Sequence, residues 1–126
     1  MANPAPEKDL KERTRKFAVR IVKMYAALPK AIEAQVIGRQ ILRSGTSVGA
    51  QYHEGLRSRS SAESISKWES ALQELEETVY WLKVLGEAEV VVMARLANLL
   101  GEADELAAIL TTCVKRLKAA KTARHA

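Results

Sequence analysis

The sequence predicts an all-α fold, specifically an up-down-up-down antiparallel four-helix bundle. Its composition is the first indication: Ala, Leu, Glu, Lys and Arg dominate the 126 residues, and proline occurs only at positions 4, 6 and 29. This usage is typical of helical proteins. The second indication is spacing, because apolar residues recur at steps of three and four in four successive stretches. Each stretch therefore has one apolar face that can be buried.

The first helix is expected from about Asp9 to Leu28. Pro29 marks its boundary, because the residue before a proline disfavours the α conformation. Alternatively, Pro29 occupies the first turn of the second helix, where its missing N–H costs nothing. The second helix then continues to about Leu56. The apolar positions of these two helices are Leu10, Thr14, Phe17, Ile21, Met24 and Leu28, followed by Ile37, Ile41, Val48 and Tyr52.

The third helix is expected from about Ser60 to Gly86. Ser60 with Glu63 three residues later forms a capping-box pattern, and Gly86 suits a helix C-terminus. A link over residues 87–89, or slightly beyond, leads to the fourth helix. Short links place neighbouring helices antiparallel. The inner faces are Ile65, Trp68, Leu72, Leu75, Val79 and Leu82 in the third helix, and Leu96, Leu99, Ala103, Leu106, Leu110, Cys113 and Leu117 in the fourth.

The length of the chain fits one domain. We expect residues 1–8 to form a disordered lead, residues 9–121 the bundle, and residues 122–126 a frayed tail. Charges interrupt every apolar stretch, so we predict no membrane span. The N-terminus lacks the apolar region of a signal peptide, and the single cysteine, Cys113, cannot form an internal disulfide. We therefore expect a cytoplasmic protein in which Cys113 is a small buried side chain.

Charge is unevenly distributed along the chain. Residues 61–90 hold two basic and seven acidic side chains, whereas the segments on either side are net basic. In an up-down-up-down bundle, the start of the first helix, the link between the second and third helices, and the end of the fourth lie at the same end. This basic end supplies the candidate nucleic-acid-binding residues, which are Lys8, Lys11, Arg13, Arg15, Lys16, Arg57, Arg59, Lys115, Arg116, Lys118 and Lys121.

Two interpretations of the basic end stay open: a polyanion-binding surface, or a solvated end that favours solubility. The dipole of the fourth helix favours cations at its C-terminus, but it does not explain the cations at the start of the first helix. No aromatic residues alternate with these cations to stack on bases. Binding to nucleic acid would therefore be directed by shape or be non-specific.

The segment 40–54 combines a helical apolar pattern with small residues, among them Ser44, Gly45, Ser47 and Gly49. Because glycine inside a helix costs about 1 kcal/mol relative to alanine, these positions predict a close approach of another helix, within the bundle or between subunits.

A turn near residue 59 also fixes the register of the second helix against the third. It predicts that Arg43 pairs with Glu74 or Glu77, and that Glu54 pairs with Lys67 or with donors at the start of the third helix. The alternative is that these side chains all point to solvent. Trp68 is expected in the core, and Tyr80 and Trp81 at the edge of the bundle or at a subunit contact.

No pattern of an enzyme is present. The segment 45–49 lacks both the lysine and the preceding strand of a phosphate-binding loop. His53 is about two helical turns from Ser47 and still further from Ser44. It is therefore too far away to act as a base for either hydroxyl. The Glu-x-x-His pairs of a di-metal bundle are missing. We therefore predict no enzymatic activity, no cofactor and no bound metal.

Two segments, QILRSGTSVGAQYHE over residues 40–54 and ALQELEETVYWL over residues 71–82, resemble the bacterial four-helix-bundle family named after proteins encoded in intervening sequences of 23S ribosomal RNA genes. The resemblance covers nearly the whole chain and includes Trp81. It implies a small cytoplasmic bundle that forms a ring-like homo-oligomer, with a pentamer as the expected form. The chain departs from the family pattern at Gln51, where asparagine is frequent, and at Ala62, where lysine or arginine is frequent.

The chain is also similar to the accessory proteins of diversity-generating retroelements. That similarity implies RNA or DNA and a protein, a reverse transcriptase, as partners. Our leading hypothesis is a non-enzymatic homo-oligomeric bundle that binds structured RNA or another polyanion through its basic end. The alternative is a protein-interaction scaffold, in which the basic end complements the acidic third helix of a neighbouring subunit.

Overall fold

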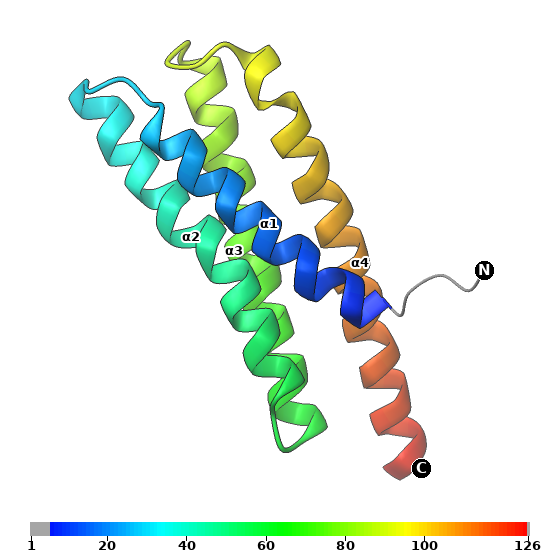
Figure 1. Ribbon diagram of the computed structural model, residues 1–126. Helices are drawn as coiled ribbons and strands as arrows, with labels where there is room; N and C mark the ends of the chain where they lie inside the picture. Colours follow the sequence, from blue (N-terminus) through cyan, green and yellow to red (C-terminus); the bar gives the residue numbers. More distant parts are fainter. Residues whose placement is uncertain (1–5, 126) are drawn as a thin grey trace.

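The computed structural model describes residues 6–125, and the surroundings of side chains over residues 10–123. Its four helices are α1 (Pro6–Ala26), α2 (Ile32–Leu56), α3 (Ser61–Glu87) and α4 (Met93–His125). Consecutive helices run in opposite directions (Figure 1). Each packs on its neighbour in the chain, and α1 also packs on α4, so the four helices surround one core. The predicted fold, an antiparallel four-helix bundle, is confirmed.

Both ends of the described chain are more helical than expected. The helix α1 begins at Pro6 rather than Asp9, because proline is tolerated in the first helical turn. At the other end α4 continues to His125, so residues 122–125 are helical rather than frayed. Neither glycine nor proline interrupts the end of this helix. Residues 1–5 of the predicted lead and residue 126 of the predicted tail lie outside the described residues.

The two links at the other end of the bundle also differ from expectation. Pro29 lies in the first link, three residues before α2 begins, so the alternative that placed it in the first turn of α2 is wrong. The helix α3 ends at Glu87, and the chain then turns at Glu89. Glu89 has a left-handed φ of 60°, the conformation that we expected Gly86 to supply at the C-terminus. Gly86 instead lies inside α3, where an added Cβ would lie 2.4 Å from Cε of Met93. The link consequently extends to residue 92.

The predicted inner faces of α1 and α4 are buried except for the half-buried Met24 and Leu117, and two predicted positions of α3 lie at the edge of its buried face. Ala71 and Thr78 are fully buried, whereas Leu72 and Val79, which the spacing favoured, are half-buried. The small side chains of Ala71 and Thr78 face the close contact with α2, and the larger neighbours lie at the edge of the core. Trp68 and Cys113 are buried as predicted, at 7% and 6% exposure.

The glycines of α2 allow α1 to approach closely within the same subunit. A Cβ added to Gly45 would lie 2.7 Å from Cγ1 of Ile21, and one added to Gly49 would lie 3.1 Å from Oγ1 of Thr14. Both distances are too short for an unadjusted contact. The predicted close approach is therefore confirmed, and it lies inside the bundle. Gly101 in α4 differs, because an added Cβ would meet nothing within 4 Å.

Candidate nucleic-acid interface

The contact between α2 and α3 fixes the end of the bundle that carries the link between them. Arg43 Nη1 lies 3.2 Å from Glu74 Oε2, and its Nη2 pairs with Glu77. Hydrogen bonding to Glu77 is the main reason that the pKa of the Arg43 guanidinium is raised above its ordinary value. Glu54 pairs with Lys67 at 2.7 Å. The register predicted from a turn near residue 59 is therefore confirmed.

The last turn of α2 is also tied to the first turns of α3. The indole Nε1 of Trp68 donates to the carbonyl oxygen of Tyr52 at 3.2 Å, and the two rings stack with centroids 5.6 Å apart. Ser64 Oγ donates to the carbonyl oxygen of Gly55 at 2.7 Å. Gly55 has no room for a side chain, because an added Cβ would lie 2.2 Å from Trp68 Nε1. These contacts hold the link over residues 57–60 in place.

The start of α3 is capped by the side chains that the sequence indicated, with one difference. Ser60 Oγ accepts from the backbone N–H of Glu63 at 3.1 Å. The Glu63 carboxylate accepts in return from the N–H of Arg59 at 3.2 Å, rather than from that of Ser60. The backbone of Arg59 is thus fixed by the cap, while its exposed side chain stays available for a ligand.

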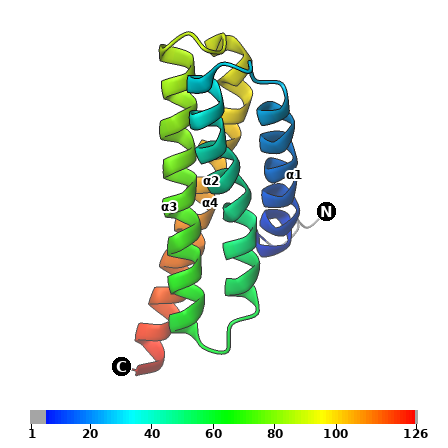
Figure 2. The ribbon, with the colours of Figure 1, turned by 90° about the vertical axis from the view of Figure 1, so that its left-hand side faces the viewer.

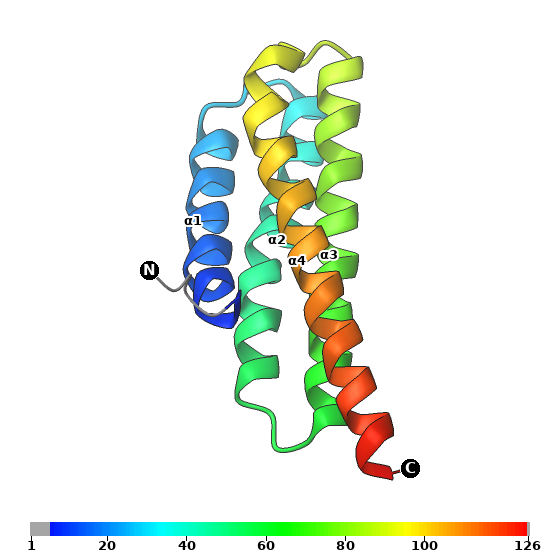
Figure 3. The ribbon, with the colours of Figure 1, turned by 90° about the vertical axis from the view of Figure 1, so that its right-hand side faces the viewer.

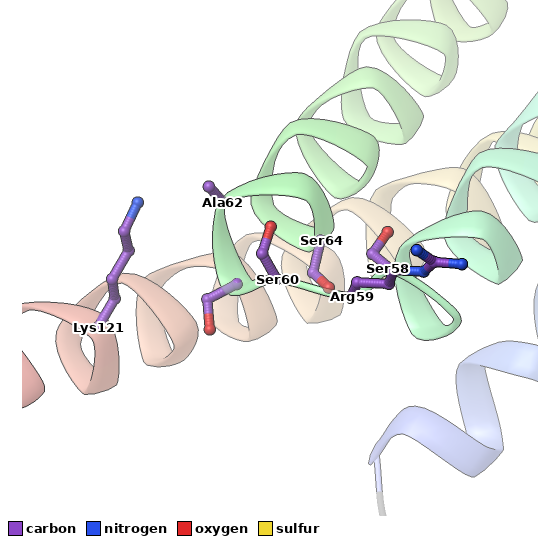
Figure 4. A pocket seen from close by; sticks show the side chains of 7 residues that line it. Ser58, Arg59, Ser60, Ala62, Ser64 and Lys121 are labelled. Atoms are coloured by element: carbon purple, nitrogen blue, oxygen red, sulfur yellow. The ribbon is translucent and has the colours of Figure 1, made fainter.

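A hollow of about 530 Å³ opens where this link meets the last turns of α4. Figure 4 shows Lys121 of α4 at one end and Arg59 of the link at the other, with serine side chains between them. Neither cation has a carboxylate within ion-pair distance among the described residues. The serines that line the hollow are Ser58, Ser60, Ser61 and Ser64.

None of the described basic side chains of α1 lines this hollow. The start of α1 stops short of the end of the bundle, while α2, α3 and α4 continue past it (Figures 2 and 3). Arg13 marks the stagger, since it pairs with Glu102 at 2.7 Å and with Glu105 at 2.6 Å. Residues 115–121 of α4 lie ten or more residues beyond Glu105, which corresponds to about 15 Å or more at 1.5 Å per residue.

The structure therefore divides the predicted basic end into two levels. Only the link and the end of α4 meet at one site; the α1 cations lie along the side of the bundle. Arg13, Lys16 and Lys118 are engaged in ion pairs, Lys118 with Glu69 and Lys16 with Glu12. The Lys8 side chain lies outside the described residues. The remaining predicted cations are exposed, apart from the half-buried Lys121; they are Lys11, Arg15, Arg57, Arg59, Lys115 and Arg116.

The other predicted features of the segment 40–54 are structural. Ser44 Oγ lies 2.7 Å from Thr78 Oγ1 in the buried contact between α2 and α3. Ser47 Oγ donates to the carbonyl oxygen of Arg43 in its own helix at 2.6 Å. Trp81 is half-buried, Tyr80 is 59% exposed, and their rings meet edge to face with centroids 4.9 Å apart. They lie at the edge of the bundle, one of the two places predicted for them.

Sequence reasoning missed the bond between α1 and α4. Glu102 and Glu105 are one helical turn apart in a largely apolar helix, so both can face Arg13. This spacing was visible, but the stagger that brings Arg13 to it was not. Within the described chain, there is no group of three or more His, Cys, Asp or Glu side chains that could hold a metal ion. None of the described helices is long and apolar enough to cross a membrane.

Comparison with known proteins shows the family of the chain. A family model described as 23S rRNA-intervening sequence protein matches residues 7–112. The chain belongs to this family. One solved member of the S23 ribosomal protein family, a protein with unknown function from Bacteroides thetaiotaomicron VPI-5482 at 1.70 Å resolution, is 34% identical. The match covers 88% of this chain and 99% of that one, with a TM-score of 0.84. No curated protein matches the chain.

Membership of the 23S rRNA-intervening sequence family accounts for the fold but not for the whole hollow. The family match ends at residue 112, before the basic last turns of α4, which carry Lys115, Arg116, Lys118 and Lys121. The contribution of α4 to the hollow therefore rests on the residues of this chain. The motif segments 40–54 and 71–82, by contrast, lie within the matched region.

Proposed function

We propose that the protein is a non-enzymatic, homo-oligomeric bundle that binds structured RNA, or another polyanion, through the end formed by the α2–α3 link and the last turns of α4. One observation carries the proposal. Arg59 and Lys121, from two different elements, open onto one serine-lined hollow without a carboxylate partner among the described residues. Such cations remain available to phosphates.

The arrangement of the hollow favours an extended anion over a single small one. Its two cations lie at opposite ends, with serine hydroxyls between them (Figure 4). Hydroxyl groups and cations together are the usual contacts to the phosphates and sugars of a nucleic acid. The hollow also lies at the N-terminus of α3, where the helix dipole favours negative charge. A nucleic-acid strand could place one phosphate near Lys121 and another near Arg59.

Further exposed cations lie near the hollow but do not line it. Arg57 precedes the hollow in the link, and Lys115 and Arg116 lie one to two turns before Lys121 in α4. Aromatic side chains are missing from this set, so stacking on single-stranded bases is not expected. The contacts are to the backbone, which suits recognition of folded RNA by shape. We place this activity in the cytoplasm.

Binding of a labelled RNA hairpin, measured by fluorescence anisotropy, tests the proposal. The variant Arg59→Gln with Lys121→Gln removes both cations of the hollow and should weaken binding. Its matched control is Arg95→Gln with Lys30→Gln, which removes the same charge from exposed positions at the opposite end of the bundle. The control should bind almost as the unchanged protein does. Equal losses in both variants would contradict the proposal.

An interaction scaffold without direct nucleic-acid binding is the second candidate. It is favoured by the acidic side of the molecule, where Glu76 and Asp104 lie beside a groove between α3 and α4. A scaffold would assemble or bind a protein but would not bind the hairpin at any salt concentration. The same anisotropy measurement on the unchanged protein therefore separates the two candidates.

A further inference from the structure

A narrow groove of about 180 Å³ lies between α3 and α4, away from the hollow. Its floor is apolar and includes Leu75, Val79 and Ala107, and its rim carries the carboxylates of Glu76 and Asp104. Neither carboxylate has a basic partner within ion-pair distance among the described residues. An apolar floor between two unpaired acids suits a partner that combines apolar and basic side chains.

Gly101 lies on the solvent side of α4, three residues before Asp104 and so close to the same face. Glycine weakens a helix interior, and each of the other glycines of the bundle faces a side chain of its own subunit that would have to shift to admit a Cβ. Gly101 has no such reason inside the subunit, since an added Cβ would meet nothing within 4 Å. A close approach by another molecule would supply the reason.

The opposite side of the bundle has complementary properties. Arg15 and His53 flank a groove of about 220 Å³ between α1 and α2, which is lined by small residues that include Ala18 and Ala50. Val19 and Val22 of α1, each 48% exposed, extend the apolar surface beside it. Arg15 has no carboxylate within ion-pair distance among the described residues.

We infer that these two sides bind each other between copies of the chain: the α1–α2 side of one subunit seats on the α3–α4 groove of the next, with Val19 and Val22 over Gly101 and Arg15 near Asp104. The inference rests on the homo-oligomer of the proposed function and names its interface. In the bundle α1 packs on α2 and α4 but not on α3, so the two sides are opposite each other. A contact between different sides is heterologous and continues from subunit to subunit until a ring closes.

Two variants that disturb opposite sides test the inference. Gly101→Trp fills the approach to the acidic groove; the position is exposed and open, so the fold should persist. Val22→Glu places a carboxylate at the centre of the basic side, also at an exposed position. Gly101→Ala adds only a Cβ at the same position and should weaken assembly less than Gly101→Trp does. Sedimentation velocity at micromolar concentration gives the assembly state, and circular dichroism checks that each variant is helical.

The unchanged protein should sediment as an assembly, Gly101→Ala should assemble more weakly, and each of the two disturbing variants should be monomeric. An equimolar mixture of Gly101→Trp and Val22→Glu should form a one-to-one dimer, because each retains the side that the other lacks. A monomeric mixture, or variants that assemble as the unchanged protein does, would overturn the inference. If the two disturbing variants assemble as the unchanged protein does, the proposed homo-oligomer stands but uses another interface. A monomeric unchanged protein overturns the homo-oligomer as well, while hairpin binding is judged separately.

Discussion

Ser44 Oγ donates a hydrogen bond to Thr78 Oγ1 at 2.7 Å in the buried contact between α2 and α3. Ser44 is the better placed donor, because the hydroxyl of Thr78 donates to the carbonyl oxygen of Glu74 at 2.8 Å, whereas the backbone acceptor of Ser44, the carbonyl oxygen of Ile41, lies at 3.5 Å. Both residues are fully buried. This small polar pair occupies the place where larger apolar side chains would hold the two helices further apart.

Removing this hydroxyl pair should lower the free energy of unfolding by a modest amount. We expect Ser44→Ala to cost about 1 kcal/mol, because one neutral buried hydrogen bond is lost while Thr78 keeps its bond to the backbone. Chemical denaturation of Ser44→Ala, Thr78→Val and the double variant gives the coupling energy of the pair. Strict additivity of the two single changes would show that the hydroxyls do not interact.

Gly45 should tolerate no side chain, in contrast to Gly101. Gly45→Ala places a Cβ against Ile21, whose β-branched side chain cannot move away freely. We expect a loss of about 1–3 kcal/mol from overpacking, despite the better helix propensity of alanine. Gly101→Ala, which adds the same methyl group where its own subunit has open space, should stabilise the separated subunit by about 0.5–1 kcal/mol. Thermal or chemical denaturation of both variants measures the difference, and equal effects would contradict the packing described for α1 and α2.

The pairing of Arg43 with Glu77 should contribute little to stability but should respond to charge reversal. Arg43 is 51% exposed, so solvent screens the pair, and Arg43→Glu is expected to cost about 1 kcal/mol or less. Adding Glu77→Arg should restore part of that loss. Chemical denaturation of the two single variants and the double variant measures this rescue; a double variant no more stable than Arg43→Glu would rule out a direct pair.

The bond between Arg13 and the two acids of α4 should hold the start of α1 in place. Its contact with Glu102 is charge-assisted and partly buried, with 25% of the Arg13 side chain and 20% of the Glu102 side chain exposed, whereas Glu105 is 69% exposed. We expect Arg13→Ala to cost about 1–3 kcal/mol. Hydrogen exchange should increase first in α1 and much less in α2. Uniform faster exchange in all four helices would mean that Arg13 contributes only to global stability.

Sequence reasoning predicted the relation of α2 to α3 well, because one short link fixes it. A turn near residue 59 was enough to bring Arg43 to the acids of α3 and Glu54 to Lys67. It failed for the relation of α1 to α4, which are neighbours in space but not in sequence. Their stagger depends on where both helices begin and end: α1 begins three residues earlier than expected, and α4 continues to His125. The prediction therefore assigned the cations of α1 to the basic end, although they lie along the side of the bundle.

Spacing alone predicted four of the six inner positions of α3 correctly and misplaced Leu72 and Val79, which are half-buried. A helix that packs between two neighbours has a wide buried surface, so the apolar Leu72 and Val79 competed with the smaller Ala71 and Thr78 for the centre. Because α2 approaches α3 closely, the smaller Ala71 and Thr78 occupy the centre of the buried face. The candidate site was recognisable from its charges, but the joint hollow of Arg59 and Lys121 needed the length of α4.

The salt dependence of hairpin binding tests the proposed function most directly. Each phosphate contact that is lost should reduce the slope of log affinity against log salt by about one unit. The Arg59→Gln, Lys121→Gln variant should therefore show a slope about two units shallower than that of the unchanged protein. The Arg95→Gln, Lys30→Gln control should keep the original slope. An unchanged slope in the hollow variant, or no salt-dependent binding by the unchanged protein, would contradict the assignment of this end as a polyanion-binding surface.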